Sequence, residues 1–368
     1  MDKREFPFNF MKKNYRLASQ DENKGFKSEH WETFPEGYES LIDRKDIWPR
    51  MLRNALSLGF NDSLIGISNK RFDDGQGDLW KKMKGGNFPD LIGDTGFSEK
   101  KITGRLSSLF RGLDNEFVLN NFIGDTGTPR VALVNIKTDE GKTCKFRFNL
   151  HDTDDIYHSW FILNQLKHIK SSKPVICEIG AGYGGVATKI KRNIPKSKII
   201  IFDLPEVNVA QSYYLSQEFK ESKFFGYRDF KEKGRSILTE DFDFLVLPGW
   251  SINELLTENS VDAYINIRSM MEMNLETIEF YFQAIQRTLK INGIFACINR
   301  YAKSVGMAGK YVNNFFKNYP FDKNWSPLYS SPSEIQPHIH FLIAKRENQP
   351  PIFPFKEILG TIRPNAFL

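Results

Sequence analysis

The segment VICEIGAGYGGVATKI, residues 175–190, holds the residue types best suited to bind a nucleotide-containing cofactor. Gly180, Gly182 and Gly185 have the G-x-G-x-x-G spacing that lets a backbone loop approach a pyrophosphate at the start of a helix. Glu178 comes just before these glycines, at the expected end of a strand. A carboxylate buried there is costly unless it is paired, and it would repel a pyrophosphate. A ligand that carries a positive charge and a ribose fits it better.

Further candidates for ligand binding follow the next two apolar runs. Asp203 ends the run KIIIFD, and Trp250 and Ser251 follow FDFLVLPG. The carboxylate of Asp203 can accept hydrogen bonds from the ribose of several cofactors, so it does not distinguish between them. Trp250 could stack on an adenine ring or simply fill the core. For Glu178 and Asp203, the structural alternative is a salt bridge.

Two residues are candidates for a general base, a group that contributes about 10²- to 10⁴-fold when it takes a proton from a hydroxyl nucleophile. Glu272 lies in SMMEMN, just after the run VDAYINI, and His151 lies in NLHDTDD. The alternative role of Glu272 is to stabilise the N-terminus of the following helix through its negative charge.

His338 and His340 alternate in the run HIHFLIAKR, so a strand there would place both rings on one face. Such a pair can bind a metal ion when a third ligand lies nearby. His338 could instead line a substrate pocket as a third candidate catalytic residue. The sequence supplies no third ligand, so the presence of a metal stays open.

The chain that must position these residues becomes regular after residue 150. Uniformly apolar runs alternate with helical segments, as in a parallel sheet that helices cover on both faces. We therefore expect a doubly wound α/β domain. Its ligands should bind outside the carboxyl ends of the strands, where Glu178, Asp203 and Glu272 fall. The expected strands are residues 175–180, 198–205, 242–250, 261–267, 293–300 and 338–346.

The segment DTDDIYHSWFILNQLKHI, which precedes the first strand, predicts a helix with an apolar face. Asp154 or Thr153 is its expected N-cap. Asp154, Asp155 and Tyr157 could also contact a cofactor's amino group or a substrate. These residues lie where the N-terminal part of the chain joins the regular part.

The first 150 residues are less regular. They include a predicted helix around residues 47–58, a stretch rich in Gly and Asp at 71–96, and a hairpin made by 131–137 and 142–150. We expect this N-terminal α+β region to recognise the substrate, because specificity is commonly built from additions to a catalytic core.

The runs EIGAGYGG, FDLP and LKING before a strand resemble the class I S-adenosylmethionine-dependent methyltransferases, over about residues 175–346. Within them, DLPEV, FLVLPGW and NIRSMMEMN look most like the bacterial sugar O-methyltransferase family. This resemblance implies a Rossmann-like, mostly parallel seven-stranded sheet and S-adenosylmethionine as the cofactor. It also implies three parts of a cofactor site. Asp203 would accept hydrogen bonds from the ribose, and Leu204, Trp250 and Ser251 would form the adenine site. The loop under the cofactor's amino-acid end would be formed by Gly180, Ala181, Gly182 and Gly184.

The expected domains are an accessory, substrate-recognition region at 1–150, a methyltransferase domain at 151–348 and a Pro-rich arm at 349–368. The arm would lie extended on its own domain or on a partner subunit. Homodimerisation is one expectation for such an arm.

The composition of the chain limits the classes of protein to which it could belong. The chain has 368 residues, a net charge of +6 spread along the sequence, and three cysteines far apart. It lacks a basic block with interleaved aromatic residues, a run of about 18 apolar residues and a signal-peptide pattern. We therefore expect a cytoplasmic protein that binds no nucleic acid and does not insert into a membrane.

The leading hypothesis is an O-methyltransferase that moves a methyl group to a sugar hydroxyl in the synthesis of a bacterial surface glycan or its precursor. The substrate would be a sugar, a nucleotide sugar or a glycan. Three alternatives stay open: a methyltransferase that acts on an amine or a phenol of a natural product, a nicotinamide-dependent oxidoreductase, and a silent cofactor-binding subunit. Glu178 argues against the oxidoreductase, since its carboxylate would face the pyrophosphate.

Overall fold

The computed structural model describes residues 6–25, 42–43, 45, 112–121, 132–137, 143–148, 150–305, 312–334 and 336–362. The helix expected at residues 47–58 and the stretch 71–96 lie outside the described residues. For residues 132–137, 143–148 and 150–153, the description is limited to the backbone.

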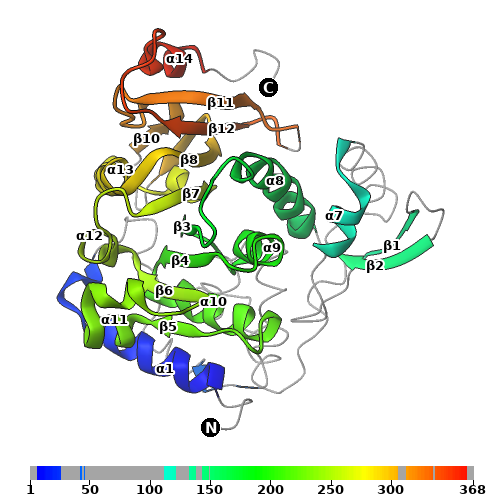
Figure 1. Ribbon diagram of the computed structural model, residues 1–368, viewed down its shortest axis with the longest axis vertical. Coiled ribbons are helices and arrows are strands. Elements are labelled where there is room, and N and C mark those ends of the chain that lie inside the picture. The colour runs from blue at the N-terminus through cyan, green and yellow to red at the C-terminus, as the bar shows by residue number, and fades with distance from the viewer. Residues whose placement is uncertain are drawn as a thin grey trace, which may run out of the picture.

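An eight-stranded sheet in the order β11-β12-β8-β7-β3-β4-β6-β5 forms the centre of the molecule (Figure 1). All neighbouring strands are parallel except that β12 runs antiparallel to both β8 and β11. The bounds of its strands are β3 (Val175–Ile179), β4 (Lys198–Asp203), β5 (Phe224–Gly226), β6 (Phe244–Pro248), β7 (Val261–Ile267), β8 (Leu289–Arg300), β11 (Trp325–Pro332) and β12 (Ile339–Arg346).

Helices cover both faces of the sheet, so each central strand buries side chains in two directions. One core contains residues of α8, α9 and α10, and the other contains residues of α11, α12 and α13. This explains why the central strands are apolar at nearly every position. The helices are α8 (Leu150–Leu166), α9 (Gly185–Asn193), α10 (Pro205–Glu218), α11 (Tyr227–Lys233), α12 (Ile252–Leu255) and α13 (Leu275–Thr288).

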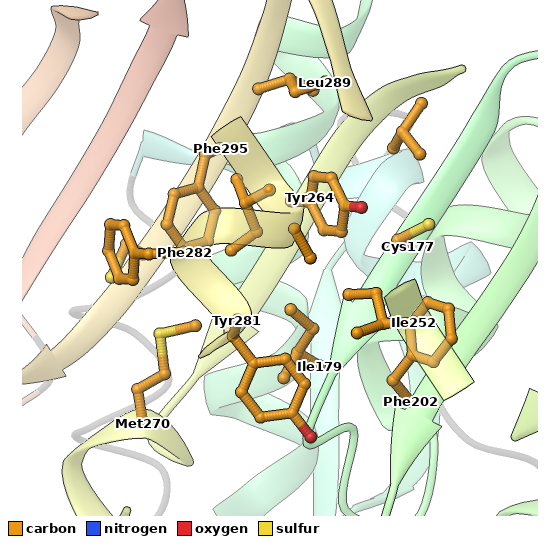
Figure 2. Packing of buried hydrophobic residues seen from close by; sticks show 14 of the residues in the cluster. Cys177, Ile179, Phe202, Ile252, Tyr264, Met270, Tyr281, Phe282, Leu289 and Phe295 are labelled. Atoms are coloured by element: carbon orange, nitrogen blue, oxygen red, sulfur yellow. The ribbon is translucent and has the colours of Figure 1, made fainter. Parts of the chain in front are cut away.

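Figure 2 shows the second of these cores, where side chains of the strands meet those of α13. Phe282 of α13 packs against Phe295 of β8, with ring centroids 5.7 Å apart and ring planes at 75°. Cys177 is fully buried in this core, and burial raises the pKa of its thiol well above the usual value. The thiol therefore serves as a small packing group.

The predicted fold class is confirmed: a mainly parallel sheet with flanking helices forms an α/β domain. The sheet has eight strands rather than seven. Strand β5 is a three-residue edge strand, and β11 contains two prolines, so neither has the long apolar run that identified the other strands. Pro332 and Pro327 are tolerated because β11 is the other edge of the sheet.

Two local expectations were wrong. Helix α8 begins at Leu150, so Asp154 lies inside the helix rather than at its N-cap. The C-terminal arm is not simply extended, because it contains α14 (Phe355–Thr361). Phe355 of this helix is fully buried, with its ring centroid 5.0 Å from that of Phe321. The arm therefore packs on its own domain.

The N-terminal helix α1 (Phe6–Ser19) lies beside α10 and α11 in Figure 1. Its aromatic side chains pack there, with Phe8 against Tyr213 and Phe6 against Phe224. A short 3₁₀ segment, Glu22–Gly25, follows. The N-terminal residues thus contribute to the core of the sheet domain, while the domain boundary at residue 150 stays a prediction.

The predicted hairpin is confirmed by β1 (Ala132–Lys137) and β2 (Thr143–Phe148), which pair antiparallel. Helix α7 (Asn115–Asn120) precedes it, and β9 (Ala302–Val305) pairs with β10 (Val312–Phe315) near the end of β8. Among the described residues, no helix is long and apolar enough to cross a membrane.

Candidate cofactor site

The strand order reverses at β3, which places a ligand site at its carboxyl end. From β3 the chain adds β4 and β6 on one side of the sheet and then returns to add β7 and β8 on the other side. Loops that leave β3 and β7 in opposite directions open a crevice between them, the usual ligand site of such sheets. The glycine loop follows β3, and the segment Arg268–Glu272 follows β7.

The glycine loop has the backbone that its sequence requires. Gly180, Gly182 and Gly184 have φ angles of +70°, +57° and +95°, which side chains rarely permit. A Cβ atom on Gly180 would also lie 2.1 Å from the Oγ atom of Ser269. The loop after β3 and the loop after β7 are therefore in direct contact, and glycine is needed at that contact.

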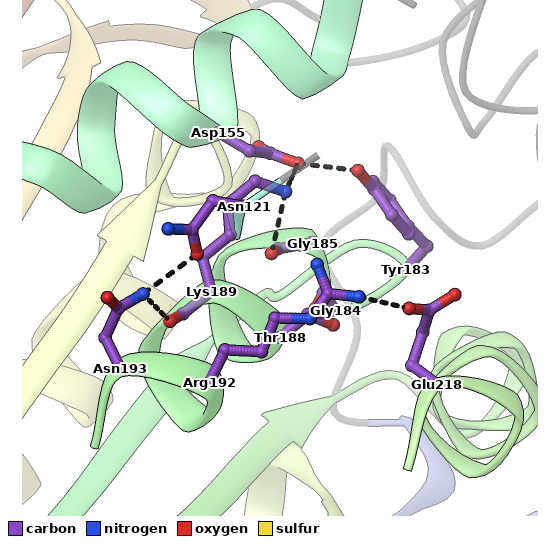
Figure 3. Close-up of polar contacts among 10 residues, drawn as sticks. All are labelled: Asn121, Asp155, Tyr183, Gly184, Gly185, Thr188, Lys189, Arg192, Asn193 and Glu218. Atoms are coloured by element: carbon purple, nitrogen blue, oxygen red, sulfur yellow. Dashed lines mark hydrogen bonds and ion pairs between the residues drawn. The ribbon is translucent and has the colours of Figure 1, made fainter. Parts of the chain in front are cut away.

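An ionic cluster between α8 and α9 holds the glycine loop in place (Figure 3). The hydroxyl of Tyr183 donates to Asp155 of α8 at 2.6 Å, and the ammonium of Lys189 lies 3.9 Å from the same carboxylate oxygen. Lys189 is fully buried and also donates to the carbonyl of Gly185 at 3.3 Å. Asp155 thus holds the loop through Tyr183 and Lys189, and its contact with a cofactor or a substrate stays a prediction.

Glu178, 3% exposed at the penultimate position of β3, lies close to this cluster. Burial raises the pKa of its carboxyl well above the usual value, and the negative charges of Asp155 and Asp203 raise it further. A hydrogen bond with the backbone of Ala187 opposes this shift. Its Oε2 atom has no hydrogen-bond partner within the described part of the chain. A buried oxygen of this kind indicates a missing donor.

Asp203, the last residue of β4, accepts a hydrogen bond from the backbone N–H of Leu204 at 2.8 Å and one from Gln211 at 2.6 Å. Burial raises the pKa of Asp203 to about 7, although these bonds and others from the backbone of Ala181 and Gly182 lower it. Asp203 therefore lies directly against the glycine loop, as the resemblance implies. Gln211 was not predicted, although its place in α10 two turns after Asp203 could have indicated it.

The three residues expected at the adenine end differ in their surroundings. Leu204 precedes α10 and is half-buried. Trp250 is 6% exposed, and its indole N–H donates to the hydroxyl of Tyr227 at 3.3 Å. Ser251 is fully buried, and its hydroxyl has no partner in the described ranges. Trp250 has a packing partner here, and the role of all three in binding adenine stays a prediction.

Two buried asparagines shape the loop after β7. Asn266 donates to the carbonyl of Ile179 at 2.8 Å and to Ser269, while its own oxygen accepts from Asn299 at 2.9 Å. Asn299 in turn accepts from the backbone N–H of Met271 at 3.1 Å. Sequence analysis missed these residues, although an asparagine inside an apolar strand was a signal, since such an amide must find partners.

Glu272 ends the short 3₁₀ segment Met270–Glu272, and its side chain is 19% exposed. The ammonium of Lys303 lies 2.6 Å from its Oε1 atom. Asn274, not Glu272, caps helix α13 by accepting from the backbone N–H of Thr277. Its ion pair with Lys303 holds the carboxylate in one direction, and its role as a base stays a prediction.

The histidines are not brought together. His338 is exposed in the turn before β12, whereas His340 is 4% exposed inside the strand and bonds with Ser330 and Tyr301. The expectation that both share one strand face was wrong. His151 lies in the first turn of α8, and its side chain is outside the described residues. Among the residues that the structure describes, no group of three His, Cys, Asp or Glu side chains could hold a metal ion.

Residues 105–234 match the model of the O-methyltransferase domain family. The match includes β3, the glycine loop, β4 and the whole of α10. A comparison with curated proteins returned no match.

Three solved structures are similar to parts of the chain. The YcgJ protein of Bacillus subtilis is 18% identical, with 40% of this chain and 52% of that chain covered and a TM-score of 0.28. A geranyl diphosphate methyltransferase in complex with SAM is 13% identical, with coverage of 54% and 87% and a TM-score of 0.37. A Burkholderia thailandensis 1,6-didemethyltoxoflavin-N1-methyltransferase is 15% identical, with coverage of 54% and 84% and a TM-score of 0.36.

The chain thus spans about half the length of the YcgJ protein that it matches. Because all three TM-scores are low, the fold assignment rests on the strand order of the sheet itself. The family match over residues 105–234 supports S-adenosylmethionine as the cofactor, while the bounds of the expected domains stay predictions. The family description does not say which compound receives the methyl group.

Proposed function

We propose that this protein is an S-adenosylmethionine-dependent O-methyltransferase that transfers a methyl group to a sugar hydroxyl, in the synthesis of a bacterial surface glycan or a sugar precursor. The observation that carries the donor half is the pair of acids at the glycine loop. Among the described residues, one oxygen of Glu178 has no hydrogen-bond partner, and Asp203 lies against the loop at the end of the next strand.

The residues present fit this donor. The loop with positive φ angles leaves room for the amino-acid end, Asp203 can accept from ribose hydroxyls, and Leu204 can contact the adenine. A sulfonium and an ammonium group also favour the two acids electrostatically. A pyrophosphate would meet these same carboxylates and be repelled, which disfavours a dinucleotide.

Methyl transfer demands mainly positioning, because the sulfonium supplies an activated carbon. An acceptor oxygen attacks that carbon, the C–S bond breaks, and its electron pair stays on the sulfur of the departing thioether. The hydroxyl proton must go to a base. We assign this step to Glu272, which follows β7 and whose carboxylate is oriented by the ammonium of Lys303. His151 and His338 are the other candidates for this role.

The acceptor half rests on the sequence resemblance of residues 175–346 to sugar O-methyltransferases. Transfer of labelled methyl groups from S-adenosylmethionine should be measured with a panel of sugars and nucleotide sugars, and in parallel with phenols and amines. Transfer to a sugar is expected. Transfer to phenols or amines alone would reject the sugar acceptor and keep the methyltransferase.

The role of Glu272 has its own test. With whichever acceptor is methylated, Glu272→Gln should lower kcat by about 10²-fold or more, while donor affinity stays as in the wild type. Lys303→Met is the matched control, since it removes the ion pair with Lys303 and keeps the carboxylate of Glu272. An unchanged kcat in Glu272→Gln would exclude this residue as the base.

A further inference from the structure

A group of basic side chains meets the carboxyl edge of the sheet beside the proposed donor site. Ile267, the last residue of β7, pairs with Ile298 of β8, so Arg268 and Arg300 follow at adjacent strand ends. Arg300 pairs with Ile339, the first residue of β12, which places His338 at the same edge. Three elements thus bring Arg268, Arg300 and His338 to one place.

The charges of this group act on one another. Arg268 and Arg300 both lower the pKa of His338, after the effect of its partial burial. Arg268 also helps to lower the pKa of His158, a buried residue of α8, to about 3, where burial is the larger cause. Guanidinium groups stay protonated at all ordinary pH values, so their repulsion cannot be relieved by losing protons.

One carboxylate partly balances this charge. The Oδ2 atom of Asp154 lies 3.9 Å from Nη1 of Arg268 and also accepts from the side chain of Gln336 at 2.7 Å. The distance to Arg268 is long for a charge-assisted hydrogen bond. The ion pair between Asp154 and Arg268 is therefore weaker than a direct charge-assisted hydrogen bond.

Polar atoms at this edge also lack partners. Nε of Arg300 is buried and makes no hydrogen bond to the described residues. His158 is 3% exposed, and neither of its ring nitrogens has a partner within the described ranges. Unsatisfied donors together with excess positive charge point to a bound anion.

Arg268 is held rigidly, as a binding residue should be. It has a φ angle of +61°, which is unusual for a residue other than glycine. Its backbone N–H donates to the carbonyl of Ile298 at 2.8 Å, and the loop that follows is fixed by the bonds of Asn266 and Asn299. Backbone strain of this kind is commonly retained at residues that bind a ligand.

We propose that Arg268 and Arg300, with His338 beside them, bind an oxyanion, a phosphate or a carboxylate, that the acceptor sugar carries. This inference rests on the proposed function and narrows its acceptor to acidic or phosphorylated sugars. Arginine suits both anions because its planar fork can donate two parallel hydrogen bonds. Arg268 begins the loop after β7 that also contains Glu272, so the anion would bind to the same loop as the proposed base.

The test uses the oxyanions themselves. Protein saturated with S-adenosylhomocysteine should be titrated with inorganic phosphate and with acetate at constant ionic strength, by calorimetry. We expect saturable binding of at least one anion, and the anion that binds identifies the source as phosphorylated or acidic sugar. Arg300→Gln and Arg268→Gln should each weaken it at least tenfold. Arg228→Gln, at an exposed arginine of α11 paired with Glu232, should leave it unchanged.

Two results would overturn the proposal. The first is no saturable binding of either anion. The second is anion binding that disappears when S-adenosylhomocysteine is present but persists with 5′-methylthioadenosine, which lacks the amino-acid end, because the arginines would then serve the donor's own carboxylate. Failure of both nucleosides to bind would instead reject the proposed function, and the effect of the arginine substitutions on anion binding to the free protein would still be measurable.

Discussion

The two edges of the same strands bury acids in different ways. At the amino edge, Asp262 near the start of β7 accepts from the backbone N–H of Val175 and from Lys290, both at 2.9 Å. At the carboxyl edge, Glu178 near the end of β3 keeps an oxygen without a partner in the described chain, and burial raises its pKa. A buried acid whose hydrogen bonds are made within the protein stabilises the fold. A buried acid with an unpaired oxygen indicates a ligand site.

The same contrast separates Asp243 from Asp203, which flank β6 and β4. Asp243 contacts the ammonium of Lys191 at 2.6 Å and accepts from the backbone N–H of Lys223 at 2.8 Å. Asp203 accepts from neutral donors, the backbone N–H of Leu204 and the amide of Gln211, and burial raises its pKa to about 7. Substitutions at the two edges should therefore affect different properties.

The largest effect is expected at the amino edge. Asp262→Ala should lower the free energy of unfolding by about 3 kcal/mol, because it leaves a part-buried backbone N–H and a part-buried ammonium without their acceptor. Chemical denaturation measures this. The control is Asp241→Ala, which removes an exposed pair with Lys223 and should lower the free energy of unfolding far less than Asp262→Ala does. Equal losses of unfolding free energy in the two variants would contradict the difference expected between buried and exposed acids.

At the carboxyl edge, Asp203→Ala should weaken S-adenosylmethionine binding by about 1.5 to 3 kcal/mol, the scale of a lost hydrogen bond to a charged group. Its unfolding free energy should change far less than that of Asp262→Ala. Calorimetric titration and denaturation of both variants give the comparison. Donor affinity equal to the wild type would remove Asp203 from the site.

Gly180→Ala tests the contact between the two loops. The added methyl group would meet Ser269 at 2.1 Å on a backbone with φ of +70°, so we expect a loss of about 2 kcal/mol in donor binding or stability. Gly182→Ala is the matched control, because its φ is +57° but no atom lies within 4 Å of the new Cβ. If both substitutions cost the same, the steric contact with Ser269 is unimportant.

Glu178→Gln should have the smallest effect, and it depends on pH. The folded state raises the pKa of Glu178, so it binds more protons than the unfolded state and loses stability as the pH rises above about 4.5. At pH 8 the neutral variant should be more stable than the wild type, because it carries no buried carboxylate charge. The two proteins should converge near pH 4. Lower stability of the variant at pH 8 would indicate a structural role for the carboxylate.

The sequence predicted what depends on the chain's own periodicity. The apolar runs located six strands, and Glu178 and Asp203 were correctly placed at strand ends beside the glycine loop. What depends on tertiary contacts was missed. His338 lies outside β12, which begins only at Ile339. The bonds of Asn266 and Asn299 join strands far apart in sequence, which no local pattern reveals.

The most direct measurement is a calorimetric titration with S-adenosylmethionine, S-adenosylhomocysteine, NAD and NADP at pH 6, 7 and 8. We expect micromolar binding of the first two and none of the dinucleotides. Because the donor's ribose should bind the ionised form of Asp203, whose pKa is about 7, binding should tighten as the pH rises and release protons near pH 7. Binding of NAD or NADP alone, at any of these pH values, would contradict the assignment of the carboxyl edge to a methyl donor.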